Sequence, residues 1–112
     1  MIDSYTFGKF VVDEKEYESN IILLGKIVNR ARYLPDHGLA FDDIIPLVEY
    51  KPEYIVIGTG ASGVMPVSDE IKELIETKGI KLIVEKTPDA CRTYNSLLSE
   101  NKKVAAFLHD TC

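Results

Sequence analysis

With 112 residues, of which 46% are hydrophobic, the chain is expected to fold as one domain over residues 1–112 with a single core. Its formal net charge of -5 disfavours binding to nucleic acid, which requires a dense Lys/Arg face, so no nucleic-acid partner is expected. The sequence shows no secretory signal and no apolar run long enough to cross a bilayer, so we expect a cytoplasmic protein without membrane contact.

The first third of the chain contains short runs of aromatic and β-branched residues. Residues 4–12 fit two antiparallel strands joined at Gly8, followed by a polar turn over residues 13–16. Residues 21–24 and 27–30 fit a second hairpin. We therefore predict an N-terminal antiparallel β unit. A small basic cluster near its end is interpreted as solvated: Lys26, Arg30 and Arg32.

A loop and a helix are predicted next. Residues 33–41 lack periodicity and contain proline and glycine, which indicates a surface loop. Asp42 is expected to cap a helix that places Ile44 and Leu47 on one face and ends before Pro52.

The second half of the chain alternates between strands and helices. Strands are predicted over residues 54–57, 80–84 and 104–108, with helices that begin near Ser68 and Thr87. Short connections between such elements imply parallel strands, right-handed crossovers and helices that cover the sheet. The expected fold class is α/β, with a parallel βαβαβ C-terminal half. The side chains expected to be buried are Ile57, Ile71, Leu74, Ile83, Leu97 and Phe107, and Ile83→Ala is expected to cost about 2–5 kcal/mol.

A glycine-rich loop follows the first of these strands. Gly58 to Gly63 matches the GxGxxG pattern of dinucleotide-binding proteins, and Glu85 ends the next strand. The mechanism requires a helix that begins within the glycines, whereas residues 64–67 precede the cap at Ser68. We favour glycines that permit positive φ and close packing. Nucleotide binding stays the less favoured interpretation, so no cofactor is predicted.

The cysteines and histidines form no complete motif. Cys91 and Cys112 have no CxxC spacing, so we predict free thiols and no metal site. A nucleophilic pair of His109 with Cys112 is conceivable, but the two residues face opposite sides if the strand continues. His37 is interpreted as a surface residue and Cys91 as a small buried hydrophobe. Asn95 is expected to hydrogen-bond to the backbone of a neighbouring segment.

Four short motifs together resemble a known family, the Mth-nine-thirty-eight domain, along essentially the whole chain. They are Ile57-Gly58-Thr59-Gly60, Thr87-x-x-Ala90 followed by Tyr94-Asn95, Lys103-Val104-Ala105-Ala106, and His109-x-Thr111-Cys112. The family includes the adipogenesis-associated domain protein of animals and, more distantly, mitochondrial complex I assembly factor three. The resemblance implies a three-layer α/β fold with a mixed sheet. It implies no reaction and no catalytic residues, and it links eukaryotic members to assembly or regulation.

The leading functional hypothesis is a non-enzymatic binding or assembly module, and self-association into a homo-oligomer stays open. The alternative is a small-molecule or anion-binding protein that uses the glycine loop at residues 58–63, followed by a small enzyme that uses His109, His37 or Cys112. Because parallel strands end on one side of a sheet, we expect a single cleft there for a protein partner or a small ligand. The residues expected to line it are Gly58, Gly60, Thr87 and His109, with Asn95 and His37 beside them.

Overall fold

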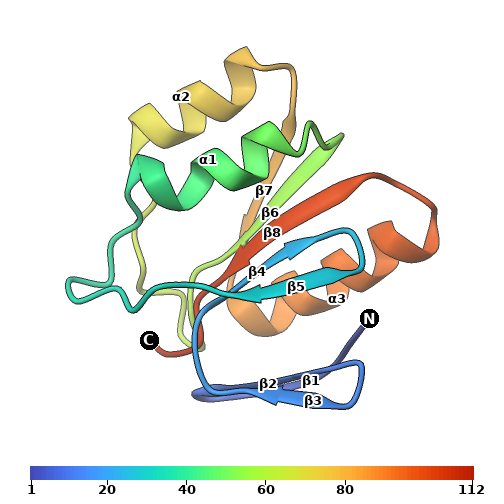
Figure 1. Ribbon diagram of the computed structural model, residues 1–112. Helices are drawn as coiled ribbons and strands as arrows, with labels where there is room; N and C mark the ends of the chain where they lie inside the picture. The colour runs from blue at the N-terminus through green and yellow to red at the C-terminus, as the bar shows by residue number, and fades with distance from the viewer.

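The computed structural model describes residues 1–112, which form two sheets and three helices (Figure 1). The three-stranded sheet has the order β1-β2-β3, and the five-stranded sheet has the order β5-β4-β8-β6-β7. The strands are β1 (Ile2–Thr6), β2 (Lys9–Val12), β3 (Lys15–Tyr17), β4 (Ile21–Leu24), β5 (Ile27–Arg30), β6 (Tyr54–Gly58), β7 (Lys81–Glu85) and β8 (Val104–Leu108). The helices are α1 (Phe41–Glu49), α2 (Asp69–Thr77) and α3 (Thr87–Ser99).

The five-stranded sheet is mixed, and its central strand is the last in the sequence. β6 pairs in parallel with β7 on one side and with β8 on the other, so Val56 lies opposite both Ile83 and Ala106. β8 also pairs with β4, in the antiparallel direction. The prediction of three mutually parallel strands is confirmed.

Side chains alternate across this sheet, which gives the molecule two apolar layers. Val56 and Leu108 face α3 and the small sheet, whereas Ile57 and Phe107 face α1 and α2. Figure 1 shows α1 and α2 on one side of the sheet and α3 on the other. The expected three-layer α/β fold is therefore confirmed.

The N-terminal antiparallel unit is present but divides between the two sheets. The β4–β5 hairpin joins the five-stranded sheet through β8, whereas β1 to β3 form their own sheet. β3 was not predicted, because the turn before it contains no glycine. Asp13 and Glu14 adopt positive φ angles of 49° and 70° there and make the tight turn that glycine or asparagine usually makes.

Two predicted helix starts have different outcomes. Ser68 does cap α2, because its hydroxyl accepts a hydrogen bond from the Ile71 N–H at 3.2 Å. The predicted cap of α1 at Asp42 is wrong, since the helix begins after Ala40. The Asp43 carboxylate holds this end by accepting a hydrogen bond from the Ala40 N–H at 2.8 Å.

Burial follows the position of each element in the sheet. Ile57, Ile71 and Phe107 are fully buried as expected. The expectation of full burial is wrong for the other three residues, which are only half-buried: Leu74, Ile83 and Leu97. Ile83 stands on β7, an edge strand with a neighbour on one side only. None of the helices is long and apolar enough to span a bilayer, and the longest, α3, has 13 residues.

Candidate functional site

The carboxyl ends of β6 and β8 lie side by side, and the chain segments that follow them are joined by hydrogen bonds. The His109 N–H donates to the Gly58 carbonyl at 3.0 Å, and the Ser62 N–H donates to the Cys112 backbone oxygen at 2.8 Å. We call this end of the sheet, formed by residues 58–63, 85–87 and 109–112, the carboxyl rim. The expected convergence of these three segments is thus present.

The glycine loop at the carboxyl rim has its N–H groups occupied by the protein itself. The Thr59 N–H donates to the Glu85 carbonyl at 2.9 Å, and the Gly60 N–H donates to the Thr87 hydroxyl at 2.8 Å. The N–H groups of residues 61, 62 and 63 also donate within the chain. Because α2 begins only at Asp69, no helix terminus opens within the glycines. The N–H groups of residues 59–63 are therefore not free to bind an anion, as the anion-binding alternative would require.

Thr87 joins the three segments of the carboxyl rim. Its hydroxyl is fully buried, accepts from Gly60 and donates to the His109 carbonyl at 2.8 Å, so it does not cap α3. A Cβ atom on Gly58 would lie 2.8 Å from the same hydroxyl oxygen. Close packing thus joins Gly58 and Gly60 to Thr87, and only glycine allows so close an approach at these two positions.

His109 is buried, with 2% of its surface exposed, and its tautomer is set by Asn20. The Asn20 Oδ1 atom lies 2.8 Å from His109 Nδ1 and also accepts from the Asp110 N–H at 2.9 Å. The Asn20 Nδ2 group donates to the Arg32 carbonyl at 3.0 Å, which fixes the orientation of the amide. His109 therefore carries its proton on Nδ1 and leaves the Nε2 lone pair free.

The electrostatic surroundings of His109 favour the neutral imidazole. Burial lowers its pKa below the ordinary value, and His37 lowers it further, while the Asp110 carboxylate opposes both effects. The Asp110 Oδ1 atom lies 3.8 Å from His109 Nδ1.

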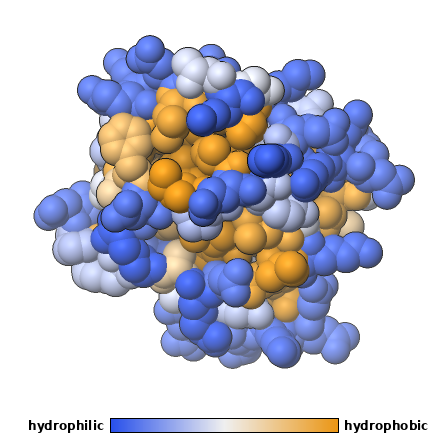
Figure 2. Space-filling model, turned by 45° about the horizontal axis from the view of Figure 1, so that its top comes forward, coloured by the Kyte–Doolittle hydropathy of each residue, from blue (hydrophilic) through white to orange (hydrophobic).

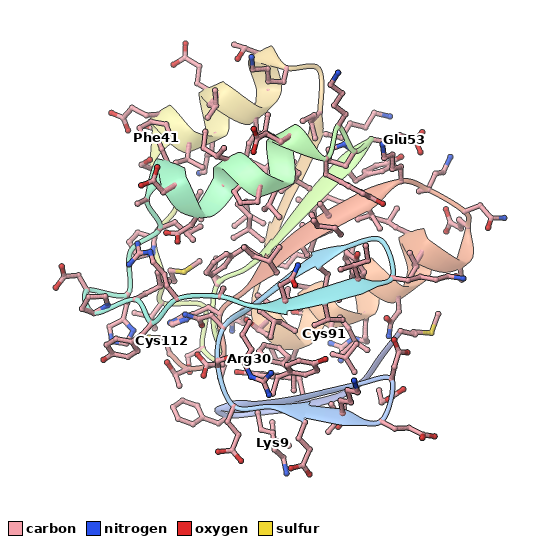
Figure 3. All side chains as sticks on the ribbon, viewed as in Figure 1. Lys9, Arg30, Phe41, Glu53, Cys91 and Cys112 are labelled. Atoms are coloured by element: carbon pink, nitrogen blue, oxygen red, sulfur yellow. The ribbon has the colours of Figure 1, made fainter.

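His37 meets the free nitrogen of His109, and Cys112 in turn contacts His37. His37 Nδ1 lies 3.3 Å from His109 Nε2, with the two rings edge to face, and Cys112 Sγ contacts the same Nδ1 atom. We call His37, His109 and Cys112 the histidine–cysteine cluster. His109 and Cys112 were expected to face opposite sides only if the strand continued, and this condition is not met because β8 ends at Leu108. Figure 3 shows the labelled Cys112 beside the loop that precedes α1.

The loop that carries His37 is held by an ion pair that the sequence did not reveal. Arg32 Nε lies 2.7 Å from Asp43 Oδ1, and Arg32 Nη2 lies 2.9 Å from Asp43 Oδ2. Asp43 is buried, and its hydrogen bond raises the pKa of Arg32. Arg32 is exposed, as the interpretation of a solvated cluster implied, but its guanidinium also pairs with the buried Asp43. His37 itself has a left-handed φ of 53° and donates its N–H to the Leu34 carbonyl at 3.1 Å.

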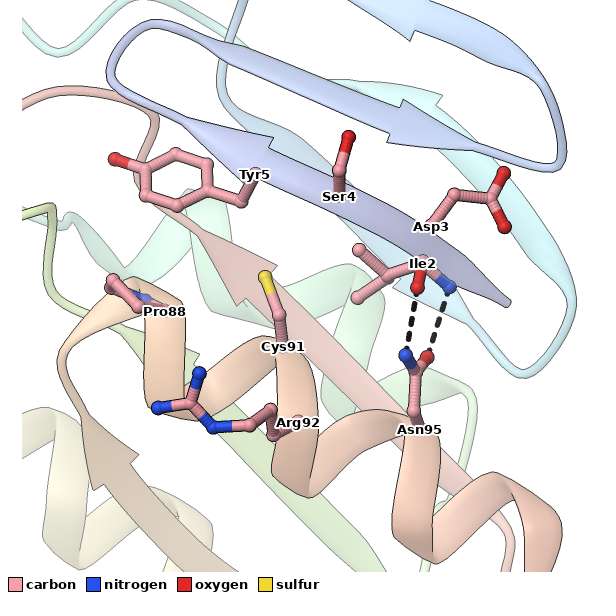
Figure 4. A pocket seen from close by; sticks show the side chains of 8 residues that line it. All are labelled: Ile2, Asp3, Ser4, Tyr5, Pro88, Cys91, Arg92 and Asn95. Carbon is pink, nitrogen blue, oxygen red and sulfur yellow. Dashed lines mark hydrogen bonds between the residues drawn. The ribbon is translucent and has the colours of Figure 1, made fainter.

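Asn95 does not join the carboxyl rim. Its amide pairs with the backbone of Ile2, accepting from the N–H at 2.9 Å and donating to the carbonyl at 2.8 Å (Figure 4). This matches the expected backbone contact and ties α3 to β1, about 12 Å along the helix from Thr87. Cys91 lines the same small pocket, and burial raises the pKa of its thiol to about 12.

The three most exposed large apolar side chains surround the carboxyl rim. Tyr33 is 77% exposed, Phe7 69% and Val64 66%, and they stand on three different loops. Two of the loops are tied directly to residues 109–112, since the Gly8 N–H donates to the Asp110 carbonyl at 2.7 Å and the Ala61 N–H donates to the Thr111 carbonyl at 3.2 Å. The loop of Tyr33 is tied to the same segment through Asn20, whose amide donates to the Arg32 carbonyl and accepts from the Asp110 N–H. Such an arrangement was not predicted, because single apolar residues in loops carry no sequence signal.

Other apolar surface lies near the helices. Figure 2 shows orange, hydrophobic areas interrupted by blue, hydrophilic residues, in a view that brings the top of Figure 1, with α1 and α2, toward the reader. On α1, Phe41 is 48% exposed and Ile45 41%, less than the three side chains at the carboxyl rim.

Comparison with known proteins identifies relatives along nearly the whole chain. Residues 2–109 match the family model described as "Protein of unknown function (DUF498/DUF598)". The 13 kDa major membrane protein of Francisella tularensis subsp. holarctica is 27% identical over 113 residues, which cover 93% of this chain and 85% of that protein. NADH dehydrogenase [ubiquinone] 1 alpha subcomplex assembly factor 3 of Danio rerio is 40% identical over 62 residues, 55% of this chain and 35% of that protein.

Solved structures share the fold. An outer membrane protein from Bartonella henselae superposes with a TM-score of 0.87 at 27% identity, over 99% of this chain and 94% of that one. The chain called MT938 superposes with a TM-score of 0.84 at 28% identity, over 100% of this chain and 98% of that one. A Bordetella pertussis protein described as an Mth938-like domain superposes with a TM-score of 0.72 at 17% identity, over 97% of this chain and 84% of that one. The resemblance inferred from the four motifs is confirmed.

Proposed function

The chain belongs to the DUF498/DUF598 family of proteins of unknown function, and on this premise we propose that it is a non-enzymatic binding module for another protein chain. Its docking surface is the carboxyl rim, where Phe7, Tyr33 and Val64 are the apolar contacts. The name of the zebrafish relative, an assembly factor, supports a role in bringing other chains together.

The observation that carries this proposal is the position of the three most exposed apolar side chains. Exposed apolar residues scattered singly are ordinary, whereas Phe7, Tyr33 and Val64 stand on three loops tied to one segment. Hydrogen bonds hold these loops in place before any partner arrives, which reduces the entropy lost on binding. Aromatic side chains are also enriched at protein interfaces. The partner is expected to present an apolar patch that covers the rim.

A binding assay with matched variants tests this proposal. The purified chain is immobilised, proteins from its native lysate are captured, and the triple variant Phe7→Ser, Tyr33→Ser, Val64→Ser is compared with the unmodified chain. Ile27→Ser is the control, because Ile27 is 60% exposed but stands beside the β4–β5 turn, at the other end of the strands. We expect the triple variant to capture at least tenfold less partner than the unmodified chain, and the control to capture the same amount.

Three outcomes would contradict the proposal. The triple variant could capture the same proteins as the unmodified chain. The unmodified chain could also capture no more protein than a support that carries no chain. Loss of capture in Phe41→Ser, Ile45→Ser, with normal capture in the triple variant, would place the interface on α1 instead. Cell fractionation of the same source tests the expected cytoplasmic location.

A further inference from the structure

We propose that the histidine–cysteine cluster is a binding site for one Zn²⁺ ion. The ligand atoms are His37 Nδ1, His109 Nε2 and Cys112 Sγ, which come from three separated parts of the chain and lie within 4.8 Å of one another. This inference goes beyond the partner-binding function and does not depend on it.

The spacing of the two imidazole nitrogens suits tetrahedral zinc. With Zn–N bonds of about 2.0–2.1 Å, two nitrogens at a tetrahedral centre are separated by about 3.3–3.4 Å. His37 Nδ1 and His109 Nε2 are 3.3 Å apart. The sulfur lies closer to His37 Nδ1 than the roughly 3.5 Å that zinc requires, so it must move outward on binding. A rotation of the half-buried Cys112 side chain provides this movement.

Asn20 prepares His109 as a ligand. Metal-binding histidines usually donate their second ring N–H to an oxygen, which orients the ring and fixes the tautomer. Here His109 donates Nδ1–H to Asn20 Oδ1 at 2.8 Å, and the Asn20 amide is itself held by Asp110 and Arg32. Nε2 therefore presents its lone pair to the cluster from a buried ring whose orientation is fixed.

The donor set selects a particular class of metal. Two imidazoles and one thiolate suit Zn²⁺ and related borderline-soft ions, whereas Ca²⁺ and Mg²⁺ require oxygen ligands. Binding moves the His37 proton from Nδ1 to Nε2 and forms a Zn–S bond, while the thiol proton of Cys112 leaves to solvent. Three protein ligands leave a fourth position for water.

Cobalt titration provides a direct test, because Co²⁺ occupies zinc sites and absorbs light. The reduced chain is titrated with CoCl₂, and we expect saturation at one ion per chain, with a near-ultraviolet sulfur-to-cobalt band and strong visible bands typical of a tetrahedral site. Added ZnCl₂ should bleach both. No saturable absorbance, or weak bands typical of six-coordinate cobalt, would overturn the proposal and leave a hydrogen bond from His37 to His109 as the explanation of the cluster.

Variants identify the ligands. Cys112→Ser should remove the sulfur band, and His37→Ala, in an exposed loop, should weaken binding at least tenfold. Cys112→His should bind cobalt more tightly than Cys112→Ser does, again without the sulfur band. If Cys112 had only a structural role, replacing it with a second kind of ligand would not have this effect. Cys91→Ala is the control with the second thiol removed, and it should bind as the unmodified chain does. A sulfur band that survives in Cys112→Ser, or disappears in Cys91→Ala, would exclude this site, and circular dichroism confirms that each variant is folded.

Discussion

The amide oxygen of Asn20 lies 2.8 Å from Nδ1 of His109, and both side chains are buried. This contact joins the residue before β4 to the residue after β8, so it links the two neighbouring strands at their ends. Asn20 serves three partners with one amide, and no other residue contacts the Nδ1–H of His109 as closely.

Removing this amide should destabilise the fold. Asn20→Ala leaves the buried His109 Nδ1–H and the Asp110 N–H without their acceptor, and each unpaired buried group costs about 1–3 kcal/mol. We expect a loss of about 2–4 kcal/mol in the free energy of unfolding, measured by urea denaturation. Asn29→Ala, at an exposed position of β5, is the control and should change stability by less than about 0.5 kcal/mol. Equal stability of the two variants would refute the role of Asn20.

The tight packing around Gly60 predicts a large difference in stability between two glycine-to-alanine variants. At Gly60, φ is +106° and a Cβ would overlap the Thr111 carbonyl oxygen. Gly60→Ala should therefore cost about 3 kcal/mol or more and displace residues 109–112. Gly8 also has positive φ, +81°, but nothing lies within 4 Å of an added Cβ, so Gly8→Ala should cost only about 1 kcal/mol. Thermal unfolding of both variants measures the difference, and similar melting temperatures would contradict it.

The two thiols should differ in reactivity. Cys91 is buried and its pKa is raised to about 12, whereas Cys112 is half-buried at the carboxyl rim. With a disulfide reagent at pH 8 we expect one fast-reacting thiol per folded chain, and two after unfolding in urea. Mass spectrometry should locate the fast modification at Cys112. Rapid labelling of Cys91 in the folded chain would show that the pocket between β1 and α3 opens readily.

The same burial predicts how stability depends on pH. The unfolded Cys91 thiol loses its proton near its ordinary pKa of 9.0, whereas the folded chain keeps it until about 12. The folded state thus binds more protons in this range, and the free energy of unfolding should fall as pH rises from about 9, with no such loss below about 8. Tyr5, whose pKa burial also raises to about 12, acts in the same direction. Cys91→Ala should show a shallower decline, and an identical decline would exclude Cys91 as a cause.

Core variants should separate the central strand from the edge strand. Phe107, on β8, is fully buried, so Phe107→Ala should cost about 3–5 kcal/mol. Ile83, on the edge strand β7, is half-buried, so the sequence-based expectation for Ile83→Ala is too large and about 1–2 kcal/mol is expected instead. Urea denaturation measures both, and the larger loss in Ile83→Ala would contradict the assigned strand order.

The elements that sequence reasoning predicted are those with local signals. Ser68 before an amphipathic run predicted the start of α2, and the alternation of strands and helices after Tyr54 predicted the parallel sheet. The turn at Asp13 and Glu14 was missed because its backbone is unusual for these residue types. The assignment of β4 to the large sheet was missed because its partner, β8, lies 80 or more positions away along the chain.

The candidate site was predicted only in part, for a related reason. His37 and His109 are 72 positions apart, and His37 and Cys112 are 75 positions apart, so no ligand spacing was visible. Their meeting depends on the turn after Leu108 and on the ion pair between Arg32 and Asp43. Gly58, Gly60 and Thr87 do converge with His109, but as a packed joint, and Asn95 is used elsewhere.

The position of β8 between β4 and β6 has a consequence for how the chain reaches its folded state. The hairpin before residue 31 and the β6–β7 pair have no direct strand pairing with each other, so neither half of the large sheet is complete until residues 104–108 insert between them. Pairings of this sequence separation form slowly. A chain interrupted before Val104 would leave the inner sides of β4 and β6 as two open strand edges, which favours aggregation. Completion of the large sheet, and of the carboxyl rim with it, therefore requires the last strand in the sequence.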